Sequence, residues 1–225
     1  MESKHCIDGI IAALKKTARP GKQAGERKGY HHGDLRTALI HAAEDLLAER
    51  GAEGFSLREV ARRAGVSPGA PAHHFSSAAG LLTEIAISGF DQLAADLQRI
   101  AETDLPPAER LQAQGIAYVR FGLKQPGRFQ LMFRHDLLLP DNDRLHAAGK
   151  TAMKELEETV RLYRTAQGRP ADDAEVMRLC LAIWSMVHGF LQLTLDGKFA
   201  ALAPDGSIDA FVVSELPAII KATWP

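Results

Sequence analysis

Side chains that can bond a polar partner gather in the short stretch SPGAPAHHF. His73 and His74 carry ring N–H donors and Ser67 carries a hydroxyl, so the stretch can bond base edges or phosphate oxygens. Gly69 and Ala70 are small enough to let the backbone approach a large ligand closely, and an alanine can contact a thymine methyl group. These residue types are compatible with contact to a nucleic acid duplex, although the stretch contains no Lys or Arg.

A short helix is expected immediately before this stretch. Ser56 followed by Glu59 is a capping-box pattern, in which each side chain satisfies a free backbone N–H at the helix start. The helix is predicted over Leu57–Ala64, with its apolar residues at helical spacing. Gly65 follows it, where a left-handed backbone conformation needs no Cβ.

The polar stretch itself is predicted to be a second short helix, Pro68–Phe75, capped by Ser67. Pro71 would then stand at the fourth helical position, where it removes an early backbone hydrogen bond, and a tightened or distorted helix start is expected. A helix, a glycine turn and a second capped helix together predict a helix-turn-helix.

A longer helix precedes the helix-turn-helix. Asp34 is expected to cap it, and it is predicted over Leu35–Arg50, ended by Gly51. Its apolar residues recur on one face, so it should pack behind the two short helices and complete a three-helix domain. That face consists of Leu35, Leu39, Ala42, Ala43, Leu46 and Leu47.

Charge is distributed unevenly along the chain. Residues 1–80 contain 12 Lys and Arg against 9 Asp and Glu, whereas residues 81–225 contain 15 against 19. The positive part includes the helix-turn-helix, which is the sign expected for contact with phosphates. Residues 1–29 are interpreted as a flexible basic arm that either reaches phosphates or the minor groove or is a solvated tail.

The composition is that of an ordinary globular protein, with 46% hydrophobic and 24% charged residues. No run of eighteen apolar residues or secretory signal is recognised, so we expect no membrane span and a cytoplasmic location. Cys6 and Cys180 cannot form a disulfide framework, which fits a reducing compartment.

The fold class is predicted to be all-α, because no strand pattern is found. We expect an arm over 1–29, a helix-turn-helix domain over 30–77 and a C-terminal domain over 78–225. The C-terminal helices are predicted at Ala78–Glu102, Ala108–Lys124, Arg128–Arg134, Asp141–Ala166, Ala174–Leu195 and Ser207–Ala222.

No pattern in the sequence indicates catalysis, a metal or a cofactor. The pairs His31-His32 and His73-His74 do not form a ligand set, because adjacent residues on a helix point about 100° apart. The sequence has no HExxH, CxxC, GxSxG, GxGxxG or GKS/T motif. We therefore expect no enzyme activity.

The segment SLREVARRAGVSPGAPAHHF, followed by AGLLTEI, resembles the DNA-binding region of TetR-family transcription regulators. The resemblance covers about Tyr30 to Ile85 with good specificity and extends weakly over the rest. The opening YHHGDLRTALIHAAEDLL and the segment Trp184–Gly189 are similar to a subgroup whose C-terminal domain carries a Trp…His-Gly signature. Ala72 and Ala78 depart from the family pattern, which usually has Tyr and Lys there; both typically touch phosphates.

The resemblance implies a DNA-binding regulator, a repressor that leaves its operator when a small apolar or amphipathic molecule binds. The partners implied are a pseudo-palindromic double-stranded operator and a second copy of the chain. The candidate DNA contacts are Tyr30, Arg36, Ser56, Arg58, Ser67, Gly69, Ala70, His73 and His74. The candidate ligand contacts are Phe121, Phe129, Met132, Phe133, Met153, Trp184 and His188. The candidate dimer contacts are Leu181, Leu191, Phe211 and Leu216.

Two other classes of function remain open from the residues alone. One is a DNA-binding protein that takes no ligand, and the other is a helical enzyme whose helix-turn-helix is incidental. Loss of operator binding on addition of a ligand would separate the regulator from the first class. Absence of specific DNA binding would favour the second.

Overall fold

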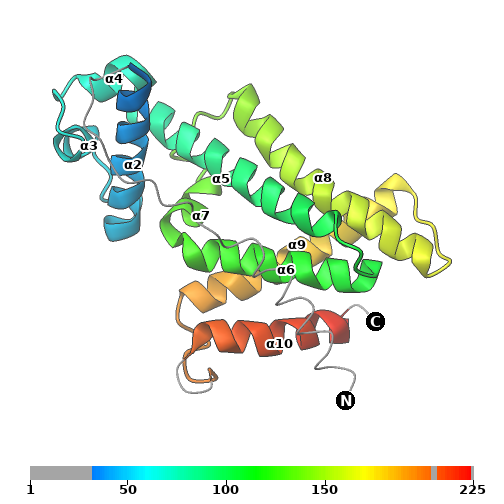
Figure 1. Cartoon of the computed structure of the whole chain (residues 1–225). Coiled ribbons are helices and arrows are strands. Elements are labelled where there is room, and N and C mark those ends of the chain that lie inside the picture. The colour runs from blue at the N-terminus through cyan, green and yellow to red at the C-terminus, as the bar shows by residue number, and fades with distance from the viewer. Residues whose placement is uncertain (1–31, 204–206, 224–225) are drawn as a thin grey trace. The chain divides into compact units, whose positions relative to one another are not determined.

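The computed structural model describes residues 32–203 and 207–223, and every regular element in these ranges is an α-helix (Figure 1). The predicted all-α class is therefore confirmed. The helices are α2 (His32–Arg50), α3 (Leu57–Arg63), α4 (Ala70–Phe75), α5 (Ala78–Ala101), α6 (Pro107–Lys124), α7 (Pro126–Met132), α8 (Asp143–Ala166), α9 (Asp173–Leu195) and α10 (Ile208–Thr223). The basic arm over 1–29 lies outside the described residues.

The chain divides into two compact units. Among the described residues, one unit consists of residues 32–91 and 125–149, and we call it the helix-turn-helix unit. The other, the C-terminal unit, consists of 92–124, 150–203 and 207–223. Helices α5 and α8 contribute residues to both units. The sequence-based boundary at residue 78 therefore differs from this division, which places α7 with the helix-turn-helix.

Helix α2 forms the base of the helix-turn-helix unit and contacts α3 and α7. The side chains of Leu39, Ala43, Leu46 and Leu47 are almost completely buried, as their helical spacing predicted. The helix begins at His32 rather than at Leu35, so Asp34 lies within its first turn and is not the N-cap. The cap prediction was wrong because the helix extends two residues further toward the N-terminus than Asp34.

Helix α3 begins where the sequence predicted, but the predicted capping box does not form. Ser56 is the N-cap residue by its extended backbone, yet its side chain makes no capping hydrogen bond. The Glu59 carboxylate is bonded by Arg62 and Arg63 instead, because two guanidinium groups compete with the backbone N–H for it. Gly65 has a φ of +69°, which confirms the left-handed turn after the helix.

Helix α4 begins two residues later than predicted. Gly69 occupies the N-cap position, and the Ser67 side chain does not cap, although its carbonyl oxygen accepts a hydrogen bond of 3.0 Å from the N–H of Ala70. Pro71 consequently lies in the first turn of the helix, where its missing N–H costs nothing. A distorted helix start was expected because Pro71 was predicted at the fourth helical position. At its actual position Pro71 requires no such distortion.

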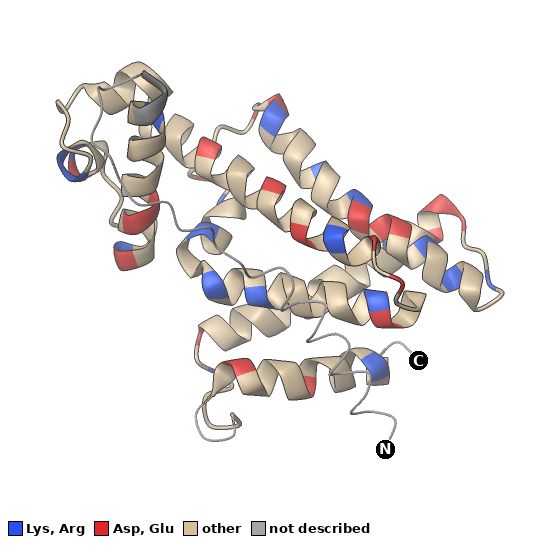
Figure 2. Ribbon diagram, viewed as in Figure 1, with Lys and Arg blue, Asp and Glu red and all other residues tan. Residues whose placement is uncertain are grey.

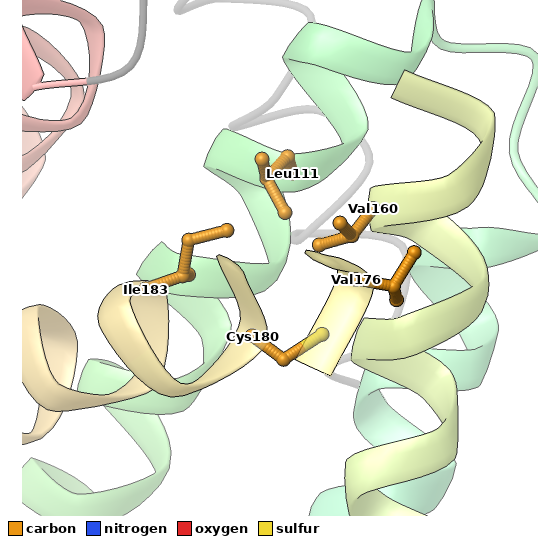
Figure 3. Close-up of a cluster of buried hydrophobic side chains, with 5 residues drawn as sticks. All are labelled: Leu111, Val160, Val176, Cys180 and Ile183. Carbon is orange, nitrogen blue, oxygen red and sulfur yellow. The ribbon is translucent and has the colours of Figure 1, made fainter. Parts of the chain in front are cut away.

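Helices α6, α8 and α9 meet in the core of the C-terminal unit (Figure 3). Leu111 of α6 and Val160 of α8 pack there against Val176, Cys180 and Ile183 of α9. Helix α6 also contacts α10. The start of α9 is fixed by a side-chain cap, because the Asp172 carboxylate accepts a hydrogen bond of 2.7 Å from the Glu175 N–H.

Candidate functional site

The candidate DNA-contacting residues of the helix-turn-helix lie largely on its surface. Ser56, Arg58, Ser67, Gly69 and His73 are exposed, while Ala70 and His74 are partly covered. A hollow of about 400 Å³ lies beside α3, lined by Ser56, Arg58, Glu59, Arg62, Val66 and Pro68. The exposed groups can therefore reach a duplex. Tyr30 lies outside the described residues.

Arg36 is the candidate DNA contact that the structure directs elsewhere. Its guanidinium forms an ion pair with Glu84 of α5 and lies 5.2 Å from the centre of the Phe75 ring. Glu84 also pairs with Arg144 at the start of α8. Arg36 therefore connects helices within the unit while 44% of its side chain remains exposed, and its contact with DNA stays a prediction.

A chain of alternating charges runs from the end of α2 across α3. Arg63 bonds both carboxylate oxygens of Glu49, at 2.9 and 2.6 Å, and one oxygen of Glu59 at 3.2 Å. Arg62 bonds both oxygens of the same Glu59, at 2.8 and 2.7 Å. The hydrogen bonds from Arg62 and then from Arg63 hold the pKa of Glu59 down at about 2. Acidic and basic positions are accordingly interspersed on these helices (Figure 2).

The described part of the helix-turn-helix region has no positive surplus. Residues 32–77 contain 5 Arg, no Lys and 6 Asp or Glu. The positive charge of residues 1–80 therefore comes from residues 1–31, which contain 7 Lys and Arg against 3 Asp and Glu. The positive sign predicted for residues 1–80 is right, but the surplus lies in residues 1–31 and not in the helix-turn-helix.

A polar cluster occupies the interior of the C-terminal unit. The Tyr118 hydroxyl accepts a hydrogen bond of 3.1 Å from the Trp184 indole N–H and lies 2.8 Å from Nδ1 of His188. The Tyr118 hydroxyl can donate to a bare Nδ1 or accept from a protonated one, because its oxygen has two lone pairs and the indole N–H occupies one of them. The three side chains therefore form one hydrogen-bonded network between α6 and α9.

Burial tunes the acid–base properties of this cluster. Burial raises the pKa of the Tyr118 hydroxyl far above its usual value and lowers the pKa of His188. Both shifts favour the neutral forms of the two side chains. The nearby core thiol of Cys180 has its pKa raised to about 11, also chiefly by burial, so it is a packing residue rather than a reactive thiolate.

Gln114 lies one helical turn before Tyr118 on α6 and is only 2% exposed. Its amide nitrogen donates to the carbonyl oxygens of Leu97 and Glu155, at 3.3 and 3.4 Å. Its amide oxygen is buried and accepts no hydrogen bond from the described residues. Gln114 is not among the predicted site residues, although a polar residue on the apolar face of a predicted helix is a signal that could have identified it.

The predicted ligand contacts are divided between the two units. The C-terminal unit contains four of them, Phe121, Met153, Trp184 and His188. Met153 packs there against the core cluster that contains Leu111. The remaining three belong to the helix-turn-helix unit, and they are Phe129, Met132 and Phe133. The Phe133 ring packs edge-on between those of Phe90 and Phe129, at centre distances of 5.7 and 5.1 Å. The structure thus does not bring all seven together within one unit.

The predicted dimer contacts differ sharply in exposure. Leu191, Phe211 and Leu216 are buried within the chain itself, at 0%, 8% and 0% exposure. Those three side chains stabilise the chain's own core, because α9 and α10 bury them within the unit. Leu181, by contrast, is 46% exposed, as is Met177 one turn earlier at 40%.

Helix α9 is unusually apolar for a helix with so much exposed surface. Residues 179–195 contain no Asp, Glu, Lys or Arg. Among the described helices, α9 alone has the length and hydropathy of a membrane span, and 33% of that window is buried. Core helices of globular proteins have the same composition, so the property is weak as an indicator of a membrane. The described residues also hold no cluster of His, Cys, Asp and Glu suited to a metal ion.

Two models of one protein family match the chain. The model "Bacterial regulatory proteins, tetR family" matches residues 39–85, and the model "Tetracyclin repressor-like, C-terminal domain" matches residues 111–215. The transcriptional repressor KstR2 of Mycobacterium tuberculosis is 34% identical over 77 residues, which are 34% of this chain. That match spans 38% of the length of KstR2.

Solved structures share the fold over most of their length. A protein of unknown function from Rhodococcus sp. RHA1 is 32% identical, with a TM-score of 0.71 over 88% of this chain and 98% of that one. AibR, solved in complex with isovaleryl coenzyme A and operator DNA, is 22% identical, with a TM-score of 0.61 over 82% of this chain and 97% of that one. At that identity, the second likeness shows the fold alone.

Proposed function

Because this chain belongs to the TetR family of bacterial transcription regulators, a family of DNA-binding proteins, we propose that it is a repressor released from its operator by a small molecule. The observation that supports DNA binding most directly is the exposed row of Ser56, Arg58, Ser67, Gly69 and His73 on a complete helix-turn-helix. Such a motif places its second helix in the major groove while its first helix crosses the backbone. In this chain those helices are α4 and α3.

The operator in this proposal is a pseudo-palindrome read by two copies of the chain. Helix α4 has only six residues, so one copy offers too little surface for tight specific binding. Two half-sites in successive major grooves lie about 34–36 Å apart or a multiple of that spacing. The base contacts come from His73, His74 and the small residues Gly69 and Ala70.

The second copy is proposed to cover the exposed face of α9. Met177 and Leu181 lie one turn apart on that face, and an apolar helix that is mostly unburied requires a cover. Leu181→Glu is expected to produce monomers by sedimentation at micromolar concentration. Leu162→Glu is the matched control, because Leu162 on α8 is equally exposed, at 48%, and lies outside this face. A stable Leu181→Glu dimer would contradict the proposal.

The ligand is proposed to be a small apolar or amphipathic molecule held in the C-terminal unit. Phe121, Trp184 and His188 supply apolar and polar lining, and the buried amide oxygen of Gln114 can accept a hydrogen bond from a ligand hydroxyl or N–H. AibR, which shares this fold, was solved in complex with isovaleryl coenzyme A and operator DNA.

Release from DNA is proposed to work by a shift in population between a form that binds the operator and one that does not. A ligand that favours the second form by about 1–3 kcal/mol changes operator occupancy by roughly 5–150-fold. Helix α5 contributes to both units and is the candidate for transmitting the change. Linkage then requires operator DNA to weaken ligand binding by the same factor.

The finer assignments follow the same line. We place the chain in the family subgroup that carries the Trp…His-Gly signature, because Trp184, His188 and Gly189 match it. We also propose a cytoplasmic location, where the operator DNA is found. The chain resembles regulators rather than enzymes, and no cofactor is proposed.

Selection of bound duplexes from a random DNA library by the purified chain tests the proposal. An inverted repeat is expected, and His73→Ala should relax the preference at one position per half-site, at a cost of about 1–3 kcal/mol. Removal of residues 1–28 should weaken binding to all duplexes and flatten its salt dependence. Recovery of no preferred sequence would contradict a repressor and favour a non-specific DNA-binding protein.

A further inference from the structure

Two arginines on the exposed face of α3 have opposite electrostatic surroundings. Arg58 and Arg62 lie four residues apart, so their side chains leave the helix on the same face, and both line the hollow beside it. Arg58 forms no ion pair with any described residue, whereas Arg62 is bonded through two nitrogens to both oxygens of Glu59. Among the described residues, only Arg62 of these two cations has an acidic partner.

The pair between Arg62 and Glu59 is better held than most surface ion pairs. Its fork-to-fork geometry is the strong arrangement for a guanidinium and a carboxylate. The Glu59 side chain is only 19% exposed, and Arg63 bonds it from its other side while itself bonding Glu49 on α2. Glu59 is thereby fixed at one position on α3, and Arg62, whose side chain is 71% exposed, must bend back to meet it.

We infer that Glu59 limits the sequence-independent attraction of this chain for DNA by withholding the Arg62 guanidinium from the phosphate backbone. The inference rests on the proposed DNA-binding function. The first helix of a helix-turn-helix crosses the backbone, so Arg58 and Arg62 are the cations of α3 placed to meet phosphates. The Glu59 carboxylate occupies the edge of the Arg62 guanidinium formed by Nε and Nη2 and neutralises its charge, which cancels most of the gain from a phosphate contact.

The consequence is that the basic arm and Arg58 supply the electrostatic attraction to phosphates. Uncharged groups supply the contacts to bases. Phosphate contacts supply affinity without sequence information, while contacts to bases supply specificity. Residues 32–77 carry more acidic than basic residues, which agrees with a domain whose non-specific attraction is kept low. Glu59 is the residue of α3 that maintains this balance.

The test measures binding of the full chain to a fluorescent random-sequence duplex as a function of salt. Releasing Arg62 by Glu59→Gln should add one phosphate contact, so the loss of affinity between about 50 and 200 mM salt should grow by about threefold. Glu53→Gln is the control, because it makes the same charge change on an exposed carboxylate that lies outside α3 and pairs with Arg134 rather than with Arg62. An equal effect of the two variants would overturn the inference, since net charge alone would then explain it.

Two further variants keep the result interpretable. Glu59→Asp preserves the charge but shortens the carboxylate, so it should raise the salt dependence in the same direction and by less. Arg62→Gln in the Glu59→Gln background should return the salt dependence to that of wild type. Retention of the full gain in this double variant, or an unchanged slope in correctly folded Glu59→Gln as judged by circular dichroism, would overturn the inference. Wild type that binds no duplex at low salt would instead overturn the proposed function.

Discussion

The two units of this chain place their polar side chains in opposite ways. In the helix-turn-helix unit, charged groups lie on the surface and pair with one another, as Arg62 and Arg63 do with Glu59. In the C-terminal unit, the uncharged groups of Gln114, Tyr118 and His188 lie on the interior faces of α6 and α9. Ion pairs on a surface set how much charge it presents to phosphates, whereas buried polar groups require fixed partners. The first arrangement suits control of surface charge, and the second suits selective recognition.

The largest expected effect is a loss of stability in the helix-turn-helix unit caused by a substitution at Gly80. A Cβ on Gly80 would lie 2.0 Å from the carbonyl oxygen of Phe75, a backbone atom that cannot move aside. Gly80→Ala should therefore destabilise this unit by more than about 3 kcal/mol in denaturant unfolding. Gly149→Ala on α8 is the control, because a Cβ there meets nothing within 4 Å and should stabilise by about 0.5–1 kcal/mol. A Gly80→Ala chain with wild-type stability would show that the turn before α5 can adjust.

The next effect tests the interior cluster. Tyr118→Phe removes the hydroxyl that joins Trp184 and His188, leaving an indole N–H and an imidazole nitrogen without that partner. We expect a loss of about 1–3 kcal/mol in the free energy of unfolding. Because the three groups form one network, Trp184→Phe should cost less in the Tyr118→Phe background than in wild type. Additive costs in this double-mutant cycle would show that the groups act independently.

A pH dependence should distinguish the units. Burial lowers the pKa of His188 in the folded chain, so between that value and the unfolded value of about 6.5 the unfolded state binds more protons. Stability should therefore fall as the pH decreases below about 6.5, and His188→Gln should remove this part of the acid sensitivity. Trp184 fluorescence in a Trp224→Phe background reports the unfolding, since the chain has two tryptophans. Identical pH profiles with and without His188 would contradict the assignment.

The smallest effect concerns Arg36, which the sequence suggested as a DNA contact. Its pairing with Glu84 and its position over Phe75 predict that Arg36→Ala costs about 1 kcal/mol of stability and leaves the salt dependence of DNA binding unchanged. Arg36→Lys should retain part of the stability. A flatter salt dependence in Arg36→Ala would instead mean that Arg36 contacts a phosphate.

The sequence by itself determined the helical class, the helix-turn-helix and most helix ends. These features depend on local signals, such as the left-handed turns at Gly51 and Gly65, which act over a few residues. Apolar periodicity likewise identified the buried face of α2, because side-chain direction repeats with the helix.

Tertiary structure decided which partner each polar group takes. Tyr118 meets His188 across 70 positions of sequence, and Arg36 meets Glu84 across 48, distances at which no local pattern specifies a pair. Glu59 shows the same dependence at short range, because Arg63 is oriented by Glu49 on α2, and the predicted capping box gives way to ion pairs. Backbone conformation follows from neighbours along the chain, whereas hydrogen-bond partners follow from the elements that packing brings together.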